Sequence, residues 1–255
     1  MLGRGYVRSV QLRRDTVESF EEYPFSIPAV RELDELALNP KVTFLVGDNG
    51  TGKSTLIEAI AVAAGFNAEG GTKNFAFATR RSESDLQRHL RLARNARRAR
   101  DGFFLRAESY FNVATEIERL DARPSFGAPV LQSYGGVSLH EQSHGESFLA
   151  LVRHRFGGDG FYVLDEPEAA LSPNRQLSLL ALMYDLVERR RSQFVVATHS
   201  PILMAYPGAT IYYLSDGGGI RQVAYEDTDH YQITKGFLGN RERYFKHLFA
   251  ESDGE

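Results

Sequence analysis

Residues 47–54 read Gly-Asp-Asn-Gly-Thr-Gly-Lys-Ser and match the pattern G-x-x-x-x-G-K-[ST]. The glycines let the backbone turn its N–H groups toward a phosphate, because a Cβ would block that close approach. Lys53 would reach the β- and γ-phosphates of a nucleotide, and the Ser54 hydroxyl would ligate Mg²⁺. We therefore predict a nucleoside triphosphate site whose binding residues are Asn49, Gly50, Thr51, Gly52, Lys53, Ser54 and Thr55.

A pair of acidic residues follows an apolar run much further along the chain, in the segment FYVLDEP at 161–167. Asp165 is suited to hold Mg²⁺ through water, and Glu166 is suited to polarise a water in line with the γ-phosphate. An acidic pair after an apolar run can equally be an ordinary turn at the end of a strand. Its combination with the phosphate loop favours the catalytic interpretation.

Two further segments could contact a phosphate. His199 ends the apolar run VVATH, where its imidazole could hydrogen-bond the γ-phosphate, although a lone histidine after a strand is ordinarily a core or surface residue. The segment QSHGES at 142–147 combines Ser143 with a small-residue turn and the start of a helix, which is a second anion site. Because one subunit holds a single γ-phosphate, this second site would serve a nucleotide bound by another subunit.

The elements that must position these residues are short and strongly apolar. We expect strands at 41–46, 160–166, 193–199 and 210–215, and helices at 54–66 and 174–191. Nearly continuous apolar strands that alternate with helices are typical of a parallel sheet covered on both faces. In such a sheet, residues that follow different strands meet at the carboxyl edge.

Residues 80–106 are rich in arginine. On a helix, one face would carry Arg88, Arg91, Arg94 and Arg98, and the opposite face would carry Leu86, Leu90 and Ala93. A solvated amphipathic helix and a surface for nucleic acid or another anionic partner both fit this pattern. The C-terminal residues 227–255 are expected to form one or two helices, with packing residues Phe237, Leu238, Tyr244, Phe245 and Leu248.

The motifs GDNGTGKST, SHGES, YVLDEP and ATHS occur in the order of the Walker A, signature, Walker B and switch-histidine motifs of ATP-binding cassette (ABC) ATPases. The chain resembles their soluble SMC/RecF-like branch, and small ATPases with the sequence DEPEAALSP. The resemblance implies one α/β P-loop NTPase domain over 1–255, with a mostly parallel sheet flanked by helices, an antiparallel N-terminal β part, and an arginine-rich lobe inserted at about 67–146.

The resemblance also assigns roles. It implies ATP and Mg²⁺ as ligands, Ser54 and Asp165 at the metal, and Lys53, Glu166 and His199 as catalytic residues. Ser143, Gly145 and Glu146 would contact ATP held by the other subunit of a head-to-tail homodimer. The signature departs from LSGGQ, because Gln142 replaces leucine and His144 replaces the first glycine. Tyr23 is a candidate for stacking on adenine, although a core or surface role fits it as well.

The composition limits the remaining classes. The net charge of −3 does not suggest a polycation that seeks DNA or lipid, the chain has no cysteine, and no apolar run is long enough to span a membrane. With no apolar signal segment at the N-terminus, we expect a soluble cytoplasmic protein. The preferred function is an ATP-hydrolysing switch or clamp that acts on nucleic acid or a protein, in repair or defence. The alternatives are the nucleotide-binding subunit of an ABC transporter and a non-hydrolysing, ATP-gated interaction module.

Overall fold

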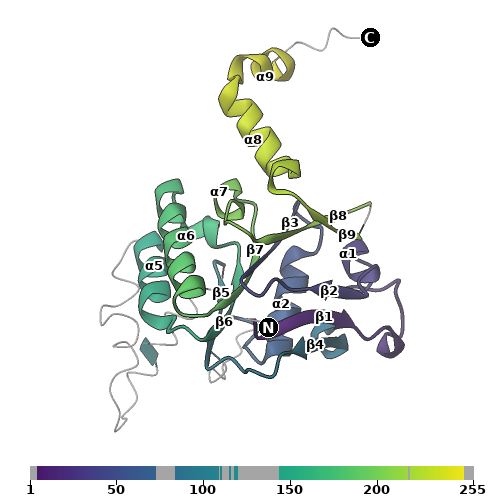
Figure 1. Ribbon diagram of the computed structural model, residues 1–255. Coiled ribbons are helices and arrows are strands. Elements are labelled where there is room, and N and C mark those ends of the chain that lie inside the picture. Colours follow the sequence, from purple (N-terminus) through teal and green to yellow (C-terminus); the bar gives the residue numbers. More distant parts are fainter. Residues whose placement is uncertain are drawn as a thin grey trace.

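The computed structural model describes residues 5–72, 84–108, 110, 115, 118–119, 144–217 and 219–249, which form two sheets with flanking helices (Figure 1). The larger sheet has the strand order β5-β6-β7-β3-β8-β9. Its strands are β3 (Val42–Gly47), β5 (Asp101–Arg106), β6 (Gly160–Asp165), β7 (Gln193–Ala197), β8 (Thr210–Ser215) and β9 (Gly219–Val223). All neighbours pair in parallel except β8 and β9. The smaller antiparallel sheet contains β1 (Val7–Leu12), β2 (Glu35–Ala37) and β4 (Leu90–Arg94).

The central strands are covered on both faces, as their unbroken apolar sequences predict. Alternate residues of β3 join different cores: Phe44 belongs to one and Leu45 to the other. One core packs helices α5 (His144–Arg155) and α6 (Pro173–Glu188) on the large sheet. The other core packs α2 (Lys53–Ala64) and the small sheet on the opposite face. The α/β class, the mostly parallel sheet and the antiparallel N-terminal part are therefore confirmed.

The strand register brings the ends of three strands to one edge. Leu45 on β3 and Asp165 on β6 both lie opposite Ala197 on β7, so the segments that follow these strands leave the sheet side by side. The chain continues from β3 into α2, which starts after Gly52 and stops at Gly65, in the left-handed conformation that commonly ends a helix. The sheet thus presents residues 47–54, 165–168 and 198–200 at its carboxyl edge.

The arginine-rich segment differs from the expected helix. Only Leu86–His89 is helical (α3), and Leu90–Arg94 forms β4, which pairs with β1 in the register Val10↔Leu92 and Gln11↔Arg91. The prediction of one helix carrying arginines from 88 to 98 on a single face was therefore wrong. The alternating sequence Leu-Arg-Leu at 90–92 suits a strand, and pairing with β1 satisfies its backbone groups.

The extent of the predicted inserted lobe, about 67–146, stays a prediction. Its described residues 84–108 contribute β4 to the small sheet and β5 to the large one. Residues 73–83 and most of 109–143 lie outside the described part of the chain.

The remaining elements are short, except for the two C-terminal helices. They are α1 (Pro28–Arg31), α7 (Pro201–Met204), and 3-10 turns at Arg14–Thr16, Pro167–Ala170 and Tyr225–Asp227. Helices α8 (Asp229–Gly239) and α9 (Arg241–Leu248) extend away from the two sheets, at the top of Figure 1. We refer to residues 229–248 as the C-terminal arm. Among the described residues, no helix has the length and apolar character needed to cross a bilayer.

The packing predicted for the C-terminal arm was only partly correct. Phe237 and Tyr244 do contact each other, with ring centroids 5.7 Å apart. Phe245 also contacts Phe237, with ring centroids 5.9 Å apart, whereas Leu238 and Leu248 are 76% and 67% exposed. Their spacing is helical, but the arm projects from the body, so no layer formed by the described residues covers these two leucines.

Candidate active site

Lys53 lies folded into its own loop at the start of α2. The side chain is 4% exposed, and Nζ donates hydrogen bonds to the carbonyl oxygens of Gly47 at 2.8 Å and Asp48 at 2.7 Å. Burial lowers the pKa of Lys53, while the nearby carboxylates of Glu166 and Asp165 oppose that change. A neutral carbonyl is a weaker hydrogen-bond acceptor for an ammonium group than a phosphate oxygen. An anion that enters the loop could therefore replace these carbonyls as the partner of Lys53.

The backbone of the loop needs glycine where it turns. Gly47 has a φ of +149°, and a Cβ there would lie 2.2 Å from the carbonyl oxygen of Leu214. At Gly50, with a φ of +86°, a Cβ would meet nothing within 4 Å, so this residue faces open space where a ligand can approach. The neighbouring Asn49 is exposed, and Thr51 is buried with its hydroxyl donating to the Asp48 carbonyl at 2.9 Å.

Ser54 and Asp165 meet across the sheet edge. The Ser54 hydroxyl donates to Asp165 Oδ1 at 3.4 Å, although the two residues come from α2 and β6. Burial raises the pKa of Asp165 to about 7, against the opposing effect of Arg106. A hydroxyl and a carboxylate are hard oxygen ligands of the kind that Mg²⁺ takes beside phosphate oxygens and water. These two residues therefore fit the predicted metal site.

Arg106 is a member of this site that the sequence analysis missed. It ends β5 directly opposite Asp165, and its side chain is 18% exposed. Its Nη1 donates to Glu58 Oε2 at 2.7 Å, and its Nε lies 3.3 Å from Asp165 Oδ2. Like YVLDE, the segment GFFLR is an apolar run that ends in a charged residue. This pattern could have indicated Arg106 as a residue at the edge of the sheet.

Glu166 and His199 also lie together at this edge. His199 Nε2 is 3.5 Å from Glu166 Oε1, and the Glu166 amide donates to the Ala197 carbonyl at 2.9 Å. Glu166 has φ 49° and ψ 51°, a left-handed conformation that residues other than glycine rarely adopt and that clusters at functional sites. This conformation turns the chain after Asp165, so the side chain of Asp165 contacts Ser54 while that of Glu166 lies near His199.

Glu168 contacts the backbone of His199, and the sequence analysis did not predict this contact. One of its carboxylate oxygens accepts a hydrogen bond from the His199 amide. Burial raises the pKa of Glu168, although that hydrogen bond lowers it in part. The sequence DEPE places this carboxylate two positions after Glu166, but only the fold shows that it contacts the histidine segment.

The chain is similar to two family models and to a curated protein. A family model described as "AAA domain, putative AbiEii toxin, Type IV TA system" matches residues 98–205, and one described as "AAA domain" matches residues 19–118. The thiamine import ATP-binding protein ThiQ of Rhizobium meliloti (strain 1021) is 28% identical over 233 residues, covering 84% of this chain and 88% of that protein.

Solved structures show the same architecture. CbiO1 from Clostridium perfringens, part of the ABC transporter complex CbiONQ, superposes with a TM-score of 0.51 and 17% identity, over 96% of this chain and 99% of that one. The SMC head domain from Thermotoga maritima matches more loosely, with a TM-score of 0.46 and 16% identity, over 86% of this chain and 99% of that one. The chain therefore has the P-loop fold of an ABC ATPase cassette.

The described part of the predicted signature segment opens α5, which lies on the other face of the sheet from α2. Ser143 is outside the described residues, and α5 begins at His144, as the sequence predicted for a helix after this turn. A Cβ at Gly145 would lie 2.5 Å from Arg175 Nη1, and Glu146 forms an ion pair with Arg175 at 3.1 Å. Helix α5 packs in one core and α2 in the other, so the two helices flank opposite faces of the sheet.

Tyr23 lies beside the ATPase-type phosphate loop. Its hydroxyl is 3.3 Å from Thr55 Oγ1, and its ring is exposed. An exposed aromatic ring at this place is available to a base, and stacking on adenine stays a prediction.

His230 is the most distant contributor to the site. Its Nε2 lies 3.0 Å from His199 Nδ1, although His230 belongs to the first turn of α8. Burial lowers the pKa of both histidines, so both are neutral near pH 7. The sequence analysis assigned no chemistry to the C-terminal region, and no local pattern around His230 distinguishes it from a surface histidine.

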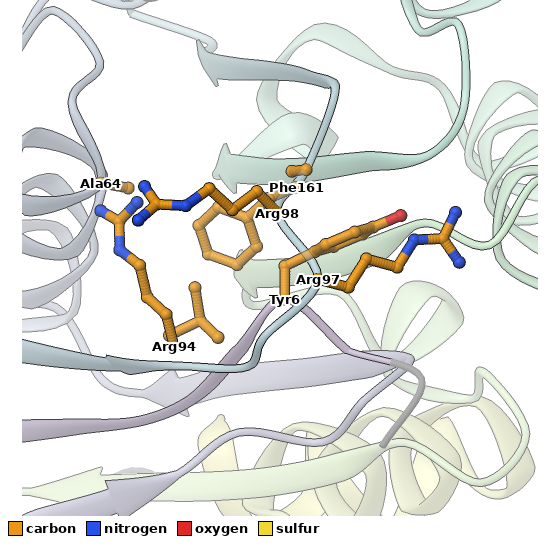
Figure 2. A pocket seen from close by; sticks show the side chains of 8 residues that line it. Tyr6, Ala64, Arg94, Arg97, Arg98 and Phe161 are labelled. Atoms are coloured by element: carbon orange, nitrogen blue, oxygen red, sulfur yellow. The ribbon is translucent and has the colours of Figure 1, made fainter. Parts of the chain in front are cut away.

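An arginine pocket lies away from these motifs, near the amino end of β6. It is lined by Tyr6, Val7, Ala64, Arg94, Arg97, Arg98, Ala99 and Phe161 (Figure 2). Arg97 extends past Tyr6 and forms an ion pair with Asp159, and Figure 2 shows the guanidinium groups of Arg94 and Arg98 near Ala64. All three arginines are exposed.

Proposed function

We propose that this chain binds Mg²⁺·ATP and hydrolyses it. The observation that supports this most strongly is the convergence of Lys53, the Ser54–Asp165 pair and the Glu166–His199 pair at one carboxyl edge. The family matches and the ABC-type fold support the same proposal.

Each residue of the chain has a distinct task in this reaction. Lys53 and the N-terminus of α2 bind the β- and γ-phosphates, and Ser54 and Asp165 hold the metal. When bound, Mg²⁺ neutralises charge on the phosphate oxygens. Glu166 accepts a proton from the attacking water, and His199 Nε2 donates a hydrogen bond to a γ-phosphate oxygen.

We further propose a head-to-tail homodimer that forms when ATP is bound. The support for this proposal is that α5, which begins with the predicted signature residues Gly145 and Glu146, and α2 flank opposite faces of the sheet within one chain. In the proposed dimer, Ser143, Gly145 and Glu146 contact the nucleotide of the second copy. In this arrangement ATP lies between two subunits, and hydrolysis releases them.

Glu166→Gln tests the reaction and the dimer together. We expect the variant to bind ATP like the wild type, to lose turnover by about 100-fold or more, and to elute as an ATP-dependent dimer in size-exclusion chromatography. Glu188→Gln is the matched control, because Glu188 pairs with Lys41 away from the site. A variant that stays monomeric with ATP while the wild type hydrolyses normally would contradict the dimer. A wild type as slow as the variant would indicate an ATP-gated module without catalysis.

We propose that the switch operates in the cytoplasm, where it acts on nucleic acid or a protein partner in repair or defence. A family description that names a putative AbiEii toxin and a Type IV TA system is compatible with the defence role. The test is ATP-dependent retention of DNA or RNA in a mobility-shift assay across a range of salt. If ATP causes no retention of DNA or RNA, the proposal that the switch acts on nucleic acid is refuted.

The similarity to ThiQ and CbiO1 favours a second candidate, the nucleotide-binding subunit of an ABC transporter. This candidate predicts that the chain co-purifies with a membrane protein from detergent extracts. A switch that acts on nucleic acid predicts that DNA or RNA, rather than such a protein, raises the rate of phosphate release.

A further inference from the structure

The two ring nitrogens of His199 face two different residues, His230 and Glu166. Its Nδ1 lies 3.0 Å from His230 Nε2, and its Nε2 lies 3.5 Å from Glu166 Oε1. Neither His199 Nε2 nor His230 Nδ1 has a hydrogen-bond partner among the described residues. The contact between the two rings therefore couples the tautomer of His199 to that of His230.

The chemistry of a neutral imidazole allows only two arrangements, because one nitrogen carries hydrogen and the other is an acceptor. If His230 Nε2–H donates to His199 Nδ1, then His199 Nε2 carries a hydrogen and faces the carboxylate of Glu166. If the bond runs the other way, the lone pair of His199 Nε2 faces that carboxylate, which is electrostatically unfavourable. The Glu166 carboxylate thus favours the Nε2–H tautomer of His199, and His230 can complete this arrangement by donating its own Nε2–H to His199 Nδ1.

The position of His230 is fixed by anchors on both sides of it. The preceding residue, Asp229, accepts a hydrogen bond from the hydroxyl of Tyr213 on β8 at 2.7 Å. The Thr228 side chain caps α8 by accepting from the Tyr231 amide at 3.3 Å. These contacts hold the first turn of α8 in place, even though the rest of the C-terminal arm projects into solvent.

A further contact joins this region to the segment that carries His199. The Tyr225 hydroxyl donates to the carbonyl oxygen of Pro201 at 2.9 Å, two residues beyond His199. These contacts therefore hold the two backbone segments that carry His199 and His230 next to each other.

We propose that His230 is a positioning residue that fixes the ring of His199 as the Nε2–H tautomer, so that this N–H faces the γ-phosphate. The inference rests on the proposed function of the site, because it assigns His199 Nε2 as the donor. It adds a residue from the C-terminal helix to a constellation that otherwise comes from the strand ends.

The test compares two substitutions at one position. His230→Gln keeps an amide N–H that can reach His199 Nδ1, and His230→Phe keeps a ring without any donor. We expect His230→Phe to lower kcat by about 10- to 100-fold with the KM for ATP changed by less than about threefold, and His230→Gln to stay within about threefold of the wild type. His247→Phe on α9 is the control, because this exposed residue lies far along the arm.

A second measurement does not depend on hydrolysis. Nitrogen-15 NMR of the histidine rings reports the tautomer directly, and we expect His199 to be Nε2–H in the wild type and a mixture of tautomers in His230→Phe. A wild type in the Nδ1–H form would overturn the proposal. Equal kcat values for the Phe and Gln variants and an active wild type would also overturn it. A wild type that does not hydrolyse ATP refutes the proposed function, while the NMR result still decides the role of His230.

Discussion

Two lysines at opposite ends of the same strand lie in different surroundings, one paired with a carboxylate and one buried against carbonyl oxygens. Lys41 precedes β3 and pairs with Glu188 at 2.6 Å, with side chains that are 36% and 27% exposed. Lys53 follows β3, is 4% exposed, and has two carbonyl oxygens as its hydrogen-bond acceptors. The first charge is neutralised at the surface, and the second is held inside a loop with room for an anion.

Two aspartates at opposite ends of neighbouring strands show the same contrast. For Asp101, at the amino end of β5, burial alone would raise the pKa, but hydrogen bonds from Tyr162 and the Gly157 amide and the charge of Arg155 bring it below its usual value. For Asp165, at the carboxyl end of β6, burial wins, and the pKa rises to about 7. A buried carboxylate with a raised pKa beside the phosphate loop marks this edge as a candidate functional site.

The largest expected effect comes from exchanging the two lysines for alanine. Lys53→Ala should abolish ATP binding or lower turnover by at least about 100-fold, because it removes the cation that contacts the β- and γ-phosphates. Lys41→Ala should leave both unchanged and cost less than about 1 kcal/mol of stability. Calorimetric ATP titration and thermal unfolding measure the two effects. Equal losses of ATP binding in the two variants would contradict the claim that only the lysine after β3 contacts the nucleotide.

The next largest effect is expected at Arg106. Arg106→Gln leaves Asp165 and Glu58 without their buried cation, so we expect a loss of about 3–5 kcal/mol in the free energy of unfolding without ligand. Mg²⁺ with ATP should recover part of this loss, because the metal places a positive charge beside Asp165. Chemical denaturation with and without Mg²⁺·ATP provides the measurement. A destabilisation that Mg²⁺·ATP does not reduce would contradict the placement of the metal.

The two aspartates should give opposite dependences of stability on pH. The folded pKa of Asp165 lies above its unfolded value, so its contribution is fully present at low pH and is lost as the pH rises toward about 7. Asp165→Asn should therefore gain stability over the wild type by about 2–4 kcal/mol between pH 4 and pH 7. Asp101 has a lowered pKa, and its contribution is lost as the pH falls, so Asp101→Asn should lose stability at neutral pH. Denaturant unfolding as a function of pH decides whether the two slopes differ in sign.

The smallest effect is expected in the arginine pocket. Arg97 and its partner Asp159 are in contact with solvent, and exposed ion pairs contribute little to stability. Arg97→Gln should change the free energy of unfolding by less than about 1 kcal/mol and leave ATP turnover unchanged. If the same variant weakens ATP-dependent retention of DNA or RNA in the mobility-shift assay, the pocket belongs to a nucleic-acid surface rather than to an ordinary solvated face.

The outcome for the arginine-rich segment explains the limit of the pattern analysis. Arginines at 88, 91, 94 and 98 fit a helical spacing, yet Leu90 and Leu92 also fit the alternation of a strand. Five residues are too few to separate the two periods, and pairing with β1 decided between them.

The sequence by itself determined the phosphate loop, the order of strands and helices around it, and the α/β class. These features depend on contiguous residues, since a loop of glycines between an apolar strand and a helix has few other ways to fold. Only the tertiary structure brought Arg106 opposite Asp165 and His230 against His199, a pair separated by 31 positions. The sequence GFFLR marks Arg106 as a charged residue at a strand end, but neither contact can be read from local sequence, because strand register and the docking of α8 result from packing of the whole core.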